Sequence, residues 1–303
     1  WVSYCSYSVC PRSWSMPDER AGSGPIRAQR NSCALMLLLV FVLGQAAASE
    51  RLPGLTARAA AVVYPSSGLA IYDFRAEERL PSASTTKIMT AIVAVERLGM
   101  DTTIEASEGA SGTPPVRLGL LPGDRLRVLD ALYALLLQSA NDVASALAEN
   151  AEGSVPDFVE LMNQRARELG ARNTQFVNAN GLPASGHFST ALDLARLFRR
   201  AMQIPRLTLI MGTRAYRVPI QGVNARTETV RTTNRLLGVD PDVVAGKTGY
   251  TNAAGYCFVG LARRGPHQII VVVLGSQDLW ADVRRLMRHG WGLLERIEGD
   301  SRP

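Results

Sequence analysis

The pattern of apolar and polar positions after residue 48 predicts strands near both chain ends and helices between them. Short runs rich in β-branched and aromatic residues predict strands over 59–64, 69–74, 214–218, 228–232, 243–245, 256–263 and 268–275. Apolar residues at helical spacing predict helices over 84–98, 129–150, 156–169, 189–202 and 278–297. This order favours a mixed α/β fold of the α+β type. It would be a mostly antiparallel sheet built from both chain ends and flanked by helices, with an inserted helical lobe.

A turn that leads into a buried helix is predicted between Pro81 and Ala91. Ser84 and Lys87 are three residues apart, so on a helix they share one face, with about 5–6 Å between Cβ atoms. A hydroxyl beside an amine is a nucleophile with a base in reach, provided that burial or a second cation lowers the pKa of the amine. The helix N-terminus also favours negative charge developing near Ser84. The alternative is an ordinary helix-start serine followed by a solvated lysine.

Lysine is rare in this chain. Among 33 Lys and Arg residues, Lys87 and Lys247 are the two lysines. Arginine stays protonated and cannot act as a base, so such a chain should keep lysine mainly where a guanidinium cannot replace it. The count therefore favours a functional role over the accidental survival of two lysines.

The remaining composition is that of an ordinary globular protein, with 47% hydrophobic and 20% charged residues and a net charge of +6. The positive excess is spread along the chain, without a basic block or interleaved aromatic and basic residues. Nucleic acid is therefore not an expected partner. A mildly basic surface would suit an anionic polymer or a membrane face, but this signal is weak.

The N-terminal residues 1–48 look like a leader with a signal peptide. Arginines precede an apolar run over 34–43, and three alanines ending at Ala48 form a small-residue cleavage site. The run is too short to span a membrane, and an uncleaved anchor is the alternative. The first fifteen residues resemble neither a domain nor a signal, and the chain does not begin with Met. This favours upstream translation, with Met16 or Met36 as the true start.

The mature part of the chain, residues 49–303, contains one cysteine, Cys257, inside an apolar run. A single cysteine cannot form an internal disulfide, so we interpret Cys257 as a core residue. An exported protein without disulfides suits the periplasm, the cell envelope or secretion. The histidines His267 and His289 are isolated, so no metal site is predicted.

Two further stretches complete a candidate site. Ser139 and Asn141 lie where one apolar helical run gives way to the next. Ser139 could relay a proton and Asn141 could bond a ligand amide; a helix cap pair is the alternative. Lys247, followed by Thr248 and Gly249, lies on a predicted strand. The lysine would face a ligand carboxylate beside Ser139, and Gly246 and Gly249 would let a ligand backbone lie along the strand. A strand-end turn is the alternative.

These three stretches, Ser-x-x-Lys, Ser-x-Asn and Lys-Thr-Gly in this chain order, resemble the motif set of penicillin-binding proteins and serine β-lactamases. The chain looks most similar to the low-molecular-mass D-alanyl-D-alanine carboxypeptidases of the peptidase S11 type. The resemblance spans most of the mature chain and implies a β-lactamase/transpeptidase-like fold. It also rests on residues 136–142, 174–178, 181–182, His187, Ser189, Asp193, 233–237, 247–251 and 254–256.

The resemblance implies acyl transfer at a serine. Ser84 would be the acylated nucleophile and Lys87 its base. Ser139 and Lys247 would shuttle the proton to the leaving D-alanine, with Asn141 completing the catalytic set. No cofactor is implied. The substrate would be a peptidoglycan stem peptide, and β-lactam antibiotics would be covalent inhibitors.

The resemblance also implies how the substrate is bound. Backbone N–H groups of Ser84 and Tyr250 would form an oxyanion hole. Thr248, beside Gly249 on the predicted strand, would hold the substrate carboxylate together with an arginine early in the final helix, such as Arg284. His187, although part of the resemblance, is expected to be structural.

We therefore expect a serine-type D-Ala-D-Ala carboxypeptidase, with residues 49–303 as a single D,D-peptidase domain. Many relatives carry a further β-domain and a membrane anchor, but this chain stops just after the final helix. We therefore expect neither a β-domain nor a membrane anchor. A D,D-endopeptidase acting on cross-links, a role of some short relatives, is then the first alternative to the carboxypeptidase. A serine β-lactamase is the second alternative. It needs a base to activate water on the acyl-enzyme, which in class A is a glutamate in a loop between the second and third motifs, and the sequence around Glu168 does not match that loop motif. A non-catalytic peptidoglycan-binding relative is the third, and the intact motifs argue against it.

Overall fold

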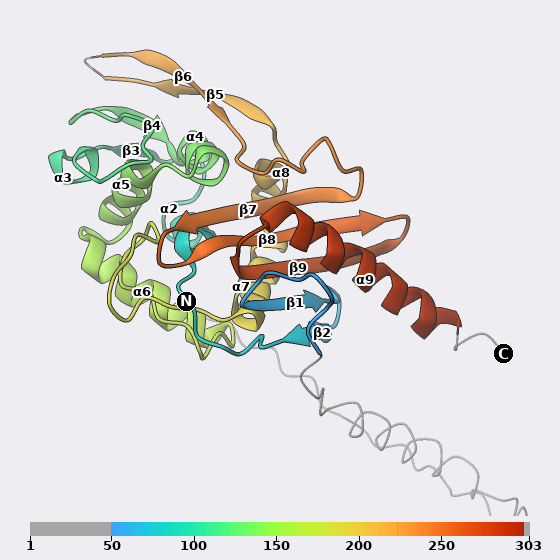
Figure 1. Ribbon diagram of the computed structural model, residues 1–303. Helices are drawn as coiled ribbons and strands as arrows, with labels where there is room; N and C mark the ends of the chain where they lie inside the picture. Colours follow the sequence, from blue (N-terminus) through green and yellow to red (C-terminus); the bar gives the residue numbers. More distant parts are fainter. Residues whose placement is uncertain (1–49, 223, 300–303) are drawn as a thin grey trace, which may run out of the picture. The chain divides into compact units, whose positions relative to one another are not determined.

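A five-stranded antiparallel sheet forms the centre of the fold (Figure 1). The computed structural model describes residues 50–222 and 224–299. The strand order is β2-β1-β9-β8-β7, so the first two strands of the sheet lie beside the last three. The strands are β1 (Ala59–Val63), β2 (Ala70–Phe74), β7 (Val243–Thr251), β8 (Gly255–Arg264) and β9 (His267–Ser276). The predicted sheet from both chain ends is confirmed.

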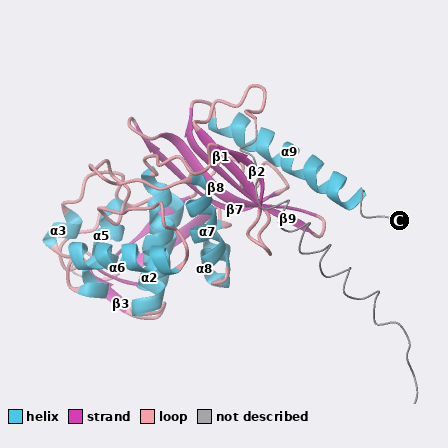
Figure 2. Ribbon diagram, turned by 90° about the horizontal axis from the view of Figure 1, so that it is seen from below, coloured by secondary structure: helices cyan, strands magenta, loops and turns pink. Residues whose placement is uncertain are grey.

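Both faces of the sheet are buried, which follows from the continuous apolar run on its central strand. Along β9, residues Ile269, Val271 and Val273 pack into one hydrophobic core, and their even-numbered neighbours pack into the other. Successive side chains of a strand point to opposite faces, so a strand with helices on both sides must be apolar throughout. Helix α9 (Leu279–Gly299) covers one face and α7 (Ala191–Met202) lies against the other (Figures 1 and 2).

The segment between β2 and β7 contains the predicted helical lobe (Figure 2). Its central helix α2 (Lys87–Leu98) packs against several others and is buried over most of its length. The remaining helices of this segment are α3 (Glu108–Ser111), α4 (Val128–Tyr133), α5 (Asn141–Glu152), α6 (Val155–Glu168), α7 and α8 (Pro205–Met211). Two small antiparallel sheets accompany them. In one, β3 (Thr103–Glu105) pairs with β4 (Arg125–Arg127), and in the other β5 (Ala215–Ile220) and β6 (Arg226–Arg231) form a hairpin.

Two predicted helices differ from the structure at positions that matter for the site. The helix expected from Ser84 begins only at Lys87, because residues Ala83–Thr86 form a 3₁₀ turn. The helix expected over 129–150 is broken into α4, a π-helical turn Ala134–Gln138 and α5. The break falls at Ser139, which has left-handed backbone angles (φ 70°, ψ 34°) that few non-glycine residues adopt.

The predicted leader, residues 1–48, lies outside the described residues. Among residues 50–222 and 224–299, no helix is both long enough and apolar enough to cross a bilayer.

Candidate active site

The 3₁₀ turn that carries Ser84 is held between two glycines. A Cβ atom added to Gly181 would lie 2.0 Å from the carbonyl oxygen of Ala83, and one added to Gly249 would lie 2.8 Å from the Ser84 nitrogen. Real Cβ atoms do not approach backbone so closely, so both positions require glycine. The missing side chain of Gly249 lets β7 approach the Ser84 turn. The expectation that a ligand backbone lies along this strand stays a prediction.

Lys87 lies one turn after Ser84 and is fully buried. Its Nζ atom lies 3.0 Å from Ser84 Oγ, 2.7 Å from Asn141 Oδ1 and 2.5 Å from the carbonyl oxygen of Asn180. Burial, followed by the charge of Lys247, lowers the pKa of Lys87 well below its ordinary value, and Asp142 opposes this shift. The expected pairing of hydroxyl and amine is therefore present, in a setting that favours the neutral amine.

Asn141 fixes the orientation of this amine. Its Nδ2 donates to the carbonyl oxygens of Pro114 (3.0 Å) and Pro115 (2.9 Å), which leaves Oδ1 to accept from Lys87. The expected bond from Asn141 to a ligand amide stays a prediction. The alternative of a helix cap pair is excluded, because α5 begins without a side-chain cap bond.

Ser139 and Lys247 meet across the same site. Lys247 Nζ lies 3.1 Å from Ser139 Oγ and donates to the carbonyl oxygen of Thr248 at 2.7 Å. Burial lowers the pKa of Lys247 to about 7. The two lysines of the chain are therefore both fully buried at one site, 160 residues apart in sequence. A lysine with this pKa can give or take a proton near neutral pH.

A cavity of about 490 Å³ opens onto these groups. Ser84, Ser139, Thr248, Gly249 and Tyr250 all line it, as the sequence predicted. Strand β7 is the last strand of the sheet, so one of its backbone edges has no strand beside it among the described residues. Such an edge can pair with an extended peptide.

Arg284 does not reach this cavity. Its guanidinium lies 3.6 Å from Asp240, and it lines a separate cavity on α9. The arginine that lines the Ser84 cavity is Arg235, two residues after Thr233, whose hydroxyl lies 2.5 Å from that of Thr248. The prediction for Arg284, which the resemblance implied, is wrong in its geometry, because Arg284 lies on the side of α9 that faces the other cavity.

Asn180 contacts Lys87 directly, and His187 contacts the neighbouring Thr86. His187 Nδ1 accepts from the Val177 amide, so Nε2 carries the hydrogen and donates to Thr86 Oγ1 at 2.8 Å. Burial, followed by Lys87, lowers the pKa of His187 to about 4. Its structural position agrees with the sequence interpretation. The Asn180 carbonyl was not predicted as a partner of Lys87, because every residue has a backbone carbonyl and the residue type therefore does not indicate this role.

Comparison with known proteins agrees with this geometry. Residues 45–278 match the peptidase S11 family, described as D-alanyl-D-alanine carboxypeptidase. The chain is 34% identical to D-alanyl-D-alanine carboxypeptidase DacF of Bacillus subtilis over 73% of its length, but spans only 57% of that relative. It is 33% identical to a D-alanyl-D-alanine endopeptidase of Pseudomonas aeruginosa, with 77% of each chain covered.

A solved structure extends the similarity to the fold. The Streptomyces K15 DD-transpeptidase has a TM-score of 0.75 and 29% identity, covering 80% of this chain and all of that chain. The predicted fold and the resemblance read from the three motifs are both confirmed. The family match covers well over half of the chain, and the structure places the serine, lysine and glycine motifs around one cavity. The chain therefore belongs to the peptidase S11 family of D-alanyl-D-alanine carboxypeptidases.

Proposed function

We propose that the protein is a serine-type D-Ala-D-Ala carboxypeptidase that removes the terminal D-alanine of peptidoglycan stem peptides. The partner set of Lys87 is the observation that carries the proposal. A neutral amine has two N–H groups and one lone pair. The two carbonyl-type acceptors, Asn141 Oδ1 and the Asn180 oxygen, use both N–H groups. The lone pair is left to accept the proton of Ser84 Oγ.

The reaction follows from these positions. Ser84 Oγ attacks the carbonyl carbon of the penultimate D-alanine while its proton passes to Lys87. The backbone N–H groups of Ser84 and Tyr250 stabilise the developing oxyanion. Lys247 and Ser139 deliver a proton to the leaving amine. Water then hydrolyses the acyl-enzyme and releases the shortened stem peptide.

The terminal carboxylate of the substrate would lie at the end of the cavity formed by Thr248, Thr233 and Arg235. Arg235 is exposed, and no bond to it is found within residues 50–222 and 224–299. A guanidinium without a protein partner is suited to hold a carboxylate through two parallel hydrogen bonds.

Replacing Arg235 with alanine should lower kcat/KM for D-alanine release about 10–100-fold, the range expected for a lost charge-assisted hydrogen bond. Arg235→Lys should restore part of this loss. Arg284→Ala is the matched control, because it removes an arginine that faces the other cavity. Steady-state kinetics on an acyl-D-Ala-D-Ala peptide would measure the effect. A loss seen for Arg284→Ala and not for Arg235→Ala would reverse the assignment.

A D,D-endopeptidase acting on cross-links is the second candidate, favoured by the similarity to the Pseudomonas relative. Release of D-alanine from a pentapeptide, compared with cleavage of a cross-linked muropeptide, separates the two activities. A serine β-lactamase is less well supported, because Glu168 is paired with Arg165 on α6 and does not line the Ser84 cavity. Failure to turn over either peptide would contradict the proposal.

We also propose export, with removal of residues 1–48 and a single D,D-peptidase domain over 49–303. The arginines, apolar run and alanine cluster of the leader are the support for this proposal. N-terminal sequencing of exported protein should begin at Ser49. Protein that keeps residues 34–43 would instead indicate an anchored enzyme.

A further inference from the structure

A loop that forms one wall of the Ser84 cavity is held by groups far from the chemistry. This cavity-wall loop spans residues 113–124 and contributes Val116, which is 52% exposed, to the cavity. On the side of the catalytic groups, the loop is bonded to Asn141. The Asn141 amide donates to the Val116 oxygen at 2.7 Å, and its side chain holds the two preceding carbonyls. Displacing the loop would therefore also release the side chain that orients Lys87.

The middle of the loop is bound by a buried carboxylate on α5. Asp142 accepts hydrogen bonds from the backbone N–H groups of Leu118 (2.9 Å), Gly119 (2.8 Å) and Leu120 (3.0 Å). These bonds use the N–H side of the loop backbone. Asn141 and Gln138 hold the carbonyl groups of loop residues 114–117, so the next carbonyl to be fixed, that of Gly119, needs a donor from another part of the chain.

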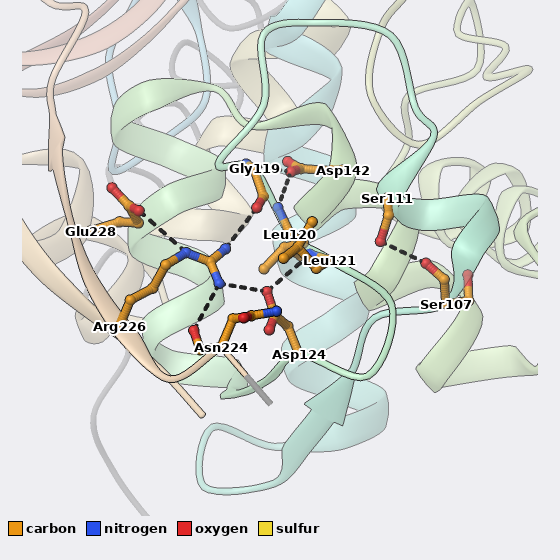
Figure 3. Close-up of polar contacts among 10 residues, drawn as sticks. All are labelled: Ser107, Ser111, Gly119, Leu120, Leu121, Asp124, Asp142, Asn224, Arg226 and Glu228. Carbon is orange, nitrogen blue, oxygen red and sulfur yellow. Dashed lines mark hydrogen bonds and ion pairs between the residues drawn. The ribbon is translucent and has the colours of Figure 1, made fainter. Parts of the chain in front are cut away.

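Arg226, the first residue of β6, supplies that donor (Figure 3). Its guanidinium donates to the Gly119 carbonyl at 2.6 Å and to Asp124 Oδ2 at 2.9 Å. Asp124 is 1% exposed and also accepts from the Leu121 amide at 2.9 Å. A planar guanidinium can hold two acceptors in fixed geometry, so Arg226 fixes the loop at two separate points.

The same strand reaches the cavity at its other end. Two residues beyond β6, Thr233 donates its amide to the Leu137 oxygen, and its hydroxyl lies beside that of Thr248. The hairpin thus contacts the loop through Arg226 and the cavity through Thr233. Glu228 Oε1 lies 3.3 Å from Arg226 Nε and faces the guanidinium from its own strand.

We propose that Arg226 is a positioning residue for acylation, which holds the cavity-wall loop so that Val116 lines the cavity and Asn141 stays bonded to Lys87. The expected effect on acylation rests on the proposed function, whereas the expected release of the cavity-wall loop does not. Loop release can be measured without any substrate. The Arg117–Leu118 bond lies within the loop. Arg117 is exposed, but Leu118 is buried, the Arg117 carbonyl accepts from Gln138 and the Leu118 amide donates to Asp142, so a protease can reach this bond only when the loop is released.

The test compares Arg226→Ala with Arg226→Lys and Arg125→Ala. Arg125 is the matched control, since its side chain forms an exposed pair with Glu105 close to the same hairpin. Arg226→Ala should raise the rate of trypsin cleavage after Arg117 about ten-fold or more, because cleavage follows the open population of the loop. The second-order constant for acylation by benzylpenicillin should fall by about three- to thirty-fold, and its dependence on pH should shift.

Arg226→Lys should have an intermediate effect on the rate of cleavage after Arg117 and on the acylation constant. Arg125→Ala should stay within about two-fold of the wild type in both. Arg226→Ala behaving like Arg125→Ala would overturn the inference. So would a loss of acylation without faster cleavage after Arg117. If Arg226→Ala does not fold, the lysine variant carries the comparison. A wild-type protein that forms no penicillin adduct would contradict the proposed function, while the cleavage rates would still decide the role of Arg226.

Discussion

Ser84→Ala should abolish covalent labelling by penicillin. The wild-type protein should gain the mass of one drug molecule, because the Ser84 hydroxyl lies beside a buried, proton-accepting amine at the mouth of the cavity. Alanine removes the only atom that forms the ester. Intact mass spectrometry after incubation with benzylpenicillin measures the adduct, and D-alanine release should fall to background in the same variant.

The control for this experiment is Ser66→Ala, which removes an exposed hydroxyl from the turn between β1 and β2. It should be labelled like the wild type. The adduct should also persist, because no glutamate that could activate water is found in the cavity lining among the residues that the structure describes. An adduct that remains in Ser84→Ala would remove the serine from the mechanism, and rapid drug turnover by the wild type would favour a β-lactamase.

Local spacing in the sequence predicted the chemical groups of the site well. The separation of Ser84 and Lys87 places them on one helical face, and a 3₁₀ turn before an α-helix preserves that relation. The rarity of lysine also indicated a role for Lys87 and Lys247, and the structure buries both beside the two serines that line the cavity. Strands β8 and β9 were predictable because each carries a run of apolar residues, whereas β7 is interrupted by Gly246, Lys247 and Gly249.

Other features depend on contacts that local patterns do not encode. Strands β3 and β4 have three residues each, too few to show a period, and they lie between the helices predicted over 84–98 and 129–150, where no element was predicted. Arg235 and Arg284 are both exposed arginines near predicted elements. The placement of Arg284 depends on how the final helix lies against the sheet, and that of Arg235 on the contact between Thr233 and Thr248. The role of Gly249 depends on the approach of the Ser84 turn, which comes from a distant part of the chain.

Lys87→Arg separates positive charge from basicity. An arginine at this position keeps one cation on the same helix face and can donate to both carbonyl-type acceptors, Asn141 Oδ1 and the Asn180 oxygen. Its guanidinium has no lone pair available for the Ser84 proton, and its pKa stays above about 12 even when buried. We expect the second-order constant for penicillin acylation to fall by at least about two orders of magnitude. Lys247→Arg should lose less if Lys247 mainly holds a carboxylate, and a comparable amount if it also transfers the proton.

The larger guanidinium also strains a fully buried site, so loss of activity alone would be ambiguous. Lys87→Met resolves this, because it keeps the length of the side chain and removes both the charge and the lone pair. If Lys87 is a general base, Lys87→Arg and Lys87→Met should lose the acylation rate to a similar extent, and thermal melting should show that both variants are folded. A purely electrostatic role predicts that Lys87→Arg retains most of the acylation rate and Lys87→Met does not. Since burial and Lys247 both favour the neutral amine of Lys87, we expect the first pattern. Acylation of Lys87→Arg at a rate near that of the wild type would remove Lys87 as the base.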